Sequence, residues 1–154
     1  MEVEIEIAAW RGECLNFFAR TEAAVSKSLD DAFSAGKVTK IRHLAGQRLA
    51  DLAELSEQIS GTNKQLAAFS NALRTWQSVE SKRQFLAHGT LMIAQGQQGW
   101  VAIFDLTTYR GSERSAERWT VTQAEASEFL ESLKDAFKRL SGQLGHFRKR
   151  IEGN

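Results

Sequence analysis

The chain has 154 residues, of which 42% are hydrophobic and 25% charged, and its formal net charge is +1 at pH 7. This composition fits a single globular domain, 1–154, that is long enough to bury a core. No apolar run is long enough to cross a bilayer, and the acidic start, residues 2–6, is unlike a signal peptide, so we expect a cytoplasmic protein with no membrane partner. A lone cysteine, Cys14, excludes an internal disulfide and a thiolate metal site, and we expect it to be buried.

Charge is unevenly distributed along the chain. Residues 1–31 carry seven acidic and three basic side chains, whereas residues 134–154 carry six basic and two acidic ones. The basic segment 148–150 has two interpretations: it contacts phosphate backbones, or it complements the carboxyl end of a helix and keeps that end soluble. The charge balance alone neither indicates nor excludes a nucleic-acid partner.

The first predicted elements are helices, and the chain has no proline to interrupt them. Apolar residues at helical spacing predict a first helix over about 3–33, although the alternation of residues 2–7 also fits a short strand. A second apolar stripe covers 41–59 and ends before a glycine.

A third helix begins near Thr62 or Asn63, either of which can serve as its N-cap. One face of this helix carries four apolar residues, Leu66, Phe69, Leu73 and Trp76. We expect the helix to continue to His88 and to end at Gly89, which would take the left-handed conformation there.

The residues that follow favour strands. Two β-rich runs, 90–94 and 100–109, are joined by a glycine-bearing turn and predict an antiparallel hairpin. A second turn over 110–115 leads to 116–121, which can add a third short strand. Thr122 and Glu125 form a capping box for a last helix. The prediction is a mainly α fold: a bundle of about four long helices with a small antiparallel hairpin of two or three strands inserted at about 90–121.

Most templates for catalytic chemistry are missing from the sequence. There is no glycine-rich phosphate loop and no nucleophile elbow. The three histidines, His43, His88 and His146, are isolated from carboxylates at metal-ligand spacing, so we expect no metal and no cofactor.

The segment from Glu80 to Gly89 remains. On a regular helix the apolar face of the third helix continues onto Glu80, and Arg83 lies on its flank, so both charged groups need partners, solvent access or an interface. Arg83 and His88 are five residues apart, about 140° around an ideal helix. They therefore meet only if the helix end distorts or if a second copy of the chain completes the site.

The pattern Arg-x-x-x-x-His from Arg83 to His88, continuing into Gly89, resembles the motif of the HEPN superfamily (higher eukaryote and prokaryote nucleotide-binding domains) in its Arg-x4-His form. Members are compact helical bundles that commonly dimerise, so that two Arg/His segments face a shared cleft. Many are metal-independent endoribonucleases of toxin–antitoxin, phage-defence or RNA-processing systems, and others are non-catalytic. Gln84 is longer than the small polar residue that the family usually has after the arginine.

The resemblance implies a homodimer, an RNA substrate and an antitoxin-like protein partner. Arg83 and His88 would then be the catalytic residues, with Glu80 and Gln84 as binding residues. The RNA's own 2′-hydroxyl is the nucleophile in this chemistry. Histidine moves its proton and arginine holds the scissile phosphate through two hydrogen bonds.

Each of these residues also has a purely structural interpretation. His88 can cap helix carbonyls, and Arg83 can pair with Glu80 at i,i+3. Two further sets of residues either contact RNA or have a structural role. The tryptophans at 10, 76, 100 and 119 can stack on bases or pack in the core. The hairpin residues Tyr109, Arg110, Arg114 and Arg118 can face RNA or form a charged, solvated edge. The alternative to a ribonuclease is therefore a non-catalytic helical module that binds a protein or a nucleotide.

Overall fold

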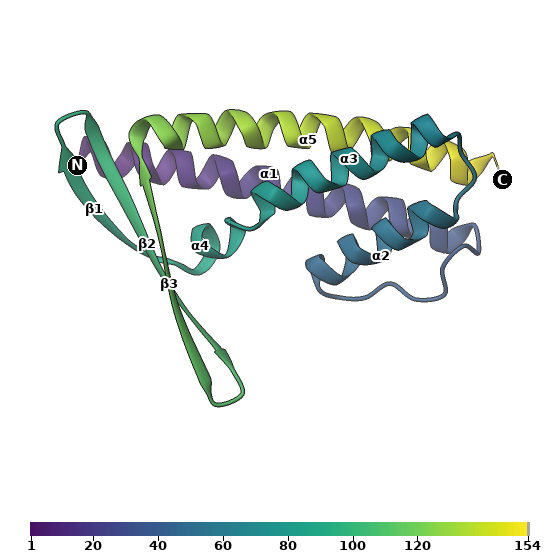
Figure 1. The fold of residues 1–154 in the computed structure, drawn as a ribbon, viewed down its shortest axis with the longest axis horizontal. Helices are drawn as coiled ribbons and strands as arrows, with labels where there is room; N and C mark the ends of the chain where they lie inside the picture. The colour runs from purple at the N-terminus through teal and green to yellow at the C-terminus, as the bar shows by residue number, and fades with distance from the viewer. Residues whose placement is uncertain (154) are drawn as a thin grey trace. The chain divides into compact units, whose positions relative to one another are not determined.

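The computed structural model describes residues 1–153 and contains a mainly helical fold with a three-stranded antiparallel sheet before the last helix (Figure 1). The elements in chain order are α1 (Glu2–Ser34), α2 (Ala45–Gln58), α3 (Asn63–Glu80), α4 (Arg83–His88), β1 (Thr90–Gly96), β2 (Gly99–Arg110), β3 (Glu113–Thr122) and α5 (Gln123–Glu152). Among the described residues, no helix combines the length and the apolar character that crossing a membrane needs.

The predicted first helix is confirmed, and the alternative of an opening strand is wrong. α1 is helical from Glu2 onward, with Ile7 fully buried and Ile5 64% exposed. An exposed isoleucine two residues before a buried one fits a helical face, because a strand would place both on the same side. α2 begins only at Ala45, so the start of the predicted second stripe, 41–44, lies in the preceding loop.

The prediction of one uninterrupted third helix is wrong. The helix breaks after Glu80, and a turn at Ser81 and Lys82 separates α3 from α4. Its start is confirmed, and Thr62 is the cap: its hydroxyl accepts a hydrogen bond from the Gln65 backbone N–H (3.2 Å), and the Gln65 side chain accepts one from the Thr62 N–H (2.8 Å).

The predicted hairpin is the first part of a sheet with strand order β1-β2-β3. The register pairs Thr90 with Asp105 and Gly96 with Gly99 in the first ladder, and the second ladder continues to Arg110 opposite Glu113. The predicted turn over 110–115 is therefore too wide, because only two residues, Gly111 and Ser112, separate the strands. Gly111 has a φ of +63°, which explains why a tight turn is possible there.

The capping box that begins α5 is confirmed. The Glu125 N–H donates to the Thr122 hydroxyl (3.2 Å), and the Thr122 N–H donates to the Glu125 carboxylate (3.1 Å). The two bonds satisfy backbone donors that would otherwise lack partners at the helix start. They also fix the point at which the chain leaves β3 and becomes helical.

Contacts divide the chain into two compact units, 1–18 with 79–134 and 19–78 with 135–154, and α1 and α5 contribute to both. The first unit contains the sheet and α4, and its core is built from α1, α4, the sheet and the start of α5. Its most buried large side chains include Ile7, Phe18, Leu86, Phe104, Val121 and Leu133. The second unit is helical. Its core includes Leu29, Leu52, Phe69, Leu140, Leu144 and Phe147.

Candidate functional site

His88 is the last residue of α4 and its side chain is exposed. Within residues 1–153 its imidazole makes no hydrogen bond, ion pair or ring contact. The structural alternative, that His88 caps the helix-end carbonyls, is not seen, because other donors bond to these carbonyls: the Gly89 N–H to Phe85 O (2.8 Å) and the Arg11 Nε to Leu86 O (2.6 Å). The His88 imidazole is therefore open to solvent and to a ligand.

Arg11 holds the end of α4 from α1. Besides the bond to Leu86 O, its Nη2 donates to Gly89 O at 3.1 Å, and its guanidinium lies 5.4 Å from the centroid of the Phe104 ring. These two carbonyls flank His88 in the chain. A charged donor at the carboxyl end of a helix also complements the partial negative charge there. Arg11 thus fixes the backbone from which the His88 side chain projects.

Gly89 is required by close packing and not by a left-handed conformation. Its φ is −68° and its ψ 141°, so the predicted left-handed cap is wrong and the chain is already extended at this residue. A Cβ at this position would collide with the Phe85 carbonyl oxygen and would lie 3.2 Å from the Phe104 Cβ. The chain can therefore pass directly from α4 into β1, close against β2, only without a side chain here.

Of the other predicted site residues, Gln84 shares a helix face with His88, whereas Glu80 and Arg83 do not. Glu80 ends α3 on the far side of the helix break, and Arg83 begins α4; both are half-buried and neither side chain is free of interactions. Gln84 is exposed and lies four residues before His88, so these two share one face of α4. Arg83 and His88 remain on different faces, because α4 is helical from the first to the second.

Sequence reasoning missed Arg11 and Lys82. Arg11 lies four residues after Ile7 and three before Cys14, both fully buried, and a charged residue beside a buried stripe is a usable signal. Lys82 lies in the turn before α4, with its ammonium 5.7 Å from the Phe85 ring centroid and 5.3 Å from that of Trp119. No sequence pattern indicates that second contact, because it depends on β3 reaching α4.

Cys14 and metal ligands do not provide an alternative site. Cys14 is fully buried, as expected, and burial raises the pKa of its thiol to about 12, so it is not a nucleophile at neutral pH. Nowhere in 1–153 do three or more His, Cys, Asp or Glu side chains gather as a metal would require.

Three of the four tryptophans are core residues in this structure. Trp10, Trp76 and Trp100 are at most 7% exposed, and the Trp10 indole N–H donates to Ala126 O at 2.8 Å. Trp119 is half-buried and stacks on Phe104, with ring centroids 5.5 Å apart. Three of the four thus have no free face for a base.

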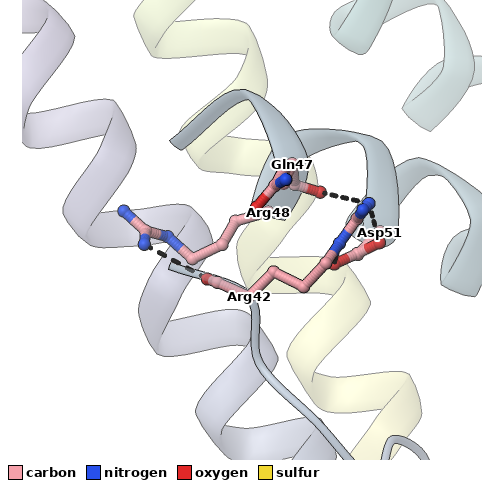
Figure 2. Close-up of polar contacts among 4 residues, drawn as sticks. All are labelled: Arg42, Gln47, Arg48 and Asp51. Atoms are coloured by element: carbon pink, nitrogen blue, oxygen red, sulfur yellow. Dashed lines mark hydrogen bonds and ion pairs between the residues drawn. The ribbon is translucent and has the colours of Figure 1, made fainter. Parts of the chain in front are cut away.

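A cavity of about 350 Å³ lies in the helical unit beside the loop before α2, and its lining includes Lys37, Lys40, Arg42, Asp51 and Glu54. Figure 2 shows that the Arg42 guanidinium is engaged in hydrogen bonds: it donates to both carboxylate oxygens of Asp51, at 2.6 and 2.9 Å, and to Gln47 O. Arg48 in turn donates to Arg42 O and His43 O. These bonds hold the loop against α2. Since Asp51 is paired with Arg42, Glu54 is the acidic residue of this lining that remains beside Lys37 and Lys40.

Comparison of the chain with protein-family models, with curated proteins and with solved structures finds no match.

Proposed function

We propose that this protein is a metal-independent endoribonuclease of the HEPN type. The observation that carries the proposal is the solvent-open imidazole of His88 on a helix end that Arg11 and Gly89 hold in place. A histidine that is not consumed by structural hydrogen bonds, but whose backbone is fixed, suits proton transfer. Gln84 shares the exposed face of α4 and is suited to contact the RNA beside it.

The reaction is a transesterification within the RNA. The 2′-hydroxyl oxygen attacks the adjacent phosphorus, His88 accepts the hydroxyl proton, and the bond to the 5′-oxygen of the next nucleotide breaks. The products are a 2′,3′-cyclic phosphate and a 5′-hydroxyl, whose proton comes from a protonated histidine. An arginine donates to the phosphate oxygens as charge develops on them.

A homodimer supplies the arginine in this proposal. Arg83 and His88 lie on different faces of one regular helix, so the α4 helices of two copies are proposed to face a shared cleft. The half-burial of Arg83 supports a fixed guanidinium more than a mobile one. An antitoxin-like protein that covers this cleft is the partner that such an enzyme would need.

The experiment is an RNA cleavage assay in the presence of a chelator. We expect cleavage to leave 2′,3′-cyclic phosphate ends and to fall by about 100- to 10,000-fold in His88→Ala, because a positioned general acid–base is lost. The matched control is His146→Ala, an exposed histidine of α5. Equal cleavage by both variants would refute the role of His88, and equal melting temperatures would exclude unfolding as the cause of a difference.

A non-catalytic binding module is the second candidate, and the sheet favours it. Met92 on β1 is 47% exposed, and Val101 and Ile103 on β2 are only half-buried, which leaves an apolar surface on one side of the sheet. A well-folded protein with no cleavage of any RNA tested, but with a retained macromolecular partner, would favour this candidate.

A further inference from the structure

The ribbon formed by β2 and β3 extends beyond β1. β1 begins at Thr90, opposite Asp105, so residues 107–116 form a two-stranded hairpin, which we call the arm (Figure 1). Every residue from 107 to 118 is exposed. Two-stranded hairpins are at best marginally stable in water when neither face is covered. The arm therefore has surface available to bind a partner.

The register divides the side chains of the arm between two faces. Residues directly opposite each other share a face, so Tyr109 and Arg114 lie together, with Thr107 and Ala116 next to them. The opposite face carries Thr108, Ser115, Arg110 and Glu113. Leu106, which is buried, points to that second face, so the Tyr109 face is the outer one.

The outer face carries one exposed aromatic ring, Tyr109, and, within residues 1–153, one arginine without an ion-pair partner, Arg114. Tyr109 is 69% exposed, and outside the backbone ladder neither its side chain nor that of Arg114 makes a hydrogen bond, ion pair or ring contact with any residue up to 153. Arg118, on the same face, is neutralised by Asp105 through bonds of 2.6 and 2.9 Å. On the inner face the one cation, Arg110, lies opposite the acidic Glu113, although the two side chains form no ion pair. The arginine of the arm that has no acidic residue opposite it is thus Arg114, on the Tyr109 side.

We infer that the outer face of the arm binds single-stranded RNA, with a base stacked on Tyr109 and a phosphate held by Arg114; this rests on the proposed ribonuclease function. Opposite Cβ atoms are about 5 Å apart, so the ring and the guanidinium can engage one nucleotide together. Bases within a duplex are already stacked and paired, which favours an unpaired strand.

The arm lies where an RNA strand bound to it can extend to His88. Phe104, against which Gly89 packs, lies five residues before Tyr109 on β2, or about 17 Å along the strand, and its side chain is on the inner face. A few nucleotides cover that distance. The arm would then hold RNA next to the cleaved position and act on binding more than on the chemical step.

The test measures binding of the full chain to a fluorescein-labelled single-stranded RNA of mixed sequence by polarisation, in the His88→Ala background so that the probe survives. Tyr109→Ala should weaken binding about five-fold or more, and Tyr109→Phe should keep it, because stacking needs only the ring. Arg114→Gln should lower the slope of log K against log salt by about 0.7, as expected for one lost phosphate contact on a single strand. Arg110→Gln, on the inner face, is the matched control.

Unchanged binding in Tyr109→Ala, or equal affinity for the same RNA as a duplex, would overturn the inference. Loss of a dimer in Tyr109→Ala, seen by size-exclusion chromatography, would overturn it in favour of a second protein copy on the arm. Failure of the two proposals is distinguishable. RNA binding that depends on Tyr109 without any cleavage by the native chain contradicts only the ribonuclease, whereas cleavage with arm variants that bind normally contradicts only the arm.

Discussion

At the scale of single residues, Gly89 and Gly142 have opposite surroundings. An added Cβ at Gly89 meets the Phe85 carbonyl and Phe104, whereas at Gly142, within α5, it meets nothing within 4 Å. We expect Gly89→Ala to lower the free energy of unfolding by about 1–3 kcal/mol through overpacking. Gly142→Ala should raise it by about 0.5–1 kcal/mol, because alanine is the better helix former.

Urea denaturation of the two variants measures both changes. A neutral or stabilising Gly89→Ala would contradict the close approach of α4 and β2 at this glycine. We also expect Gly89→Ala to lower the proposed ribonuclease activity under conditions where the variant is still folded, since His88 is the neighbouring residue.

The sequence located His88 at a helix end but could not show what surrounds it. Whether the carbonyls near His88 are capped by its own imidazole depends on Arg11, which is 75 residues from Leu86 in the chain. Helical periodicity describes one element at a time and contains no information on such a distant donor. The sequence could therefore identify His88 as a candidate, but it could not show that the imidazole makes no hydrogen bond to the rest of the described chain.

At the scale of elements, the loop before α2 is held in part by one ion pair, between Arg42 and Asp51. Hydrogen bonds from Arg42 lower the pKa of the Asp51 carboxyl, so the pair is formed throughout the neutral range and is lost only as pH falls through that lowered value. We expect Asp51→Asn to speed trypsin cleavage after the basic residues of 37–42, with little change in overall stability, because both side chains of the pair are partly exposed to solvent.

Glu57→Gln, an exposed change on the same helix, is the control for this experiment. Mass spectrometry of the first fragments identifies the cleaved bonds. Cleavage of Asp51→Asn at the native rate would show that the backbone bonds from Arg48 hold the loop without help from the carboxylate.

Element boundaries were predicted well where a local chemical signal exists. Thr122 with Glu125, and Thr62 near the start of α3, are capping residues that act within four positions of the chain. The break between α3 and α4 has no glycine or proline to mark it, so the apolar pattern continued through it. The length of the arm was missed for a similar reason, since exposed strands lack a buried alternation.

At the scale of the whole molecule, α1 and α5 each contribute to both compact units. Because helix formation is cooperative along a continuous segment, we expect one unfolding transition. Trp76→Phe tests this, since the remaining tryptophans at 10, 100 and 119 all belong to the unit with the sheet. Fluorescence then reports that unit alone, while circular dichroism reports the helices of both.

Coincident urea midpoints from the two probes are the expected result. Midpoints that differ beyond experimental error would mean that the units unfold separately and that each continuous helix frays in the middle. The mainly helical class and the place of the sheet before the last helix were predictable from hydrophobic period, whereas the division into two units depends on contacts across the chain.

Only Gly89 lies between α4 and β1, so no flexible loop follows His88. The Gly89 N–H donates to the Phe85 carbonyl and the Gly89 carbonyl accepts from Arg11, so the residue after His88 is held on both sides of its Cα. The ring can change position only by rotation about its own side-chain bonds. The backbone at His88 therefore stays in one position next to the edge strand β1, and a substrate must bind there to reach the imidazole.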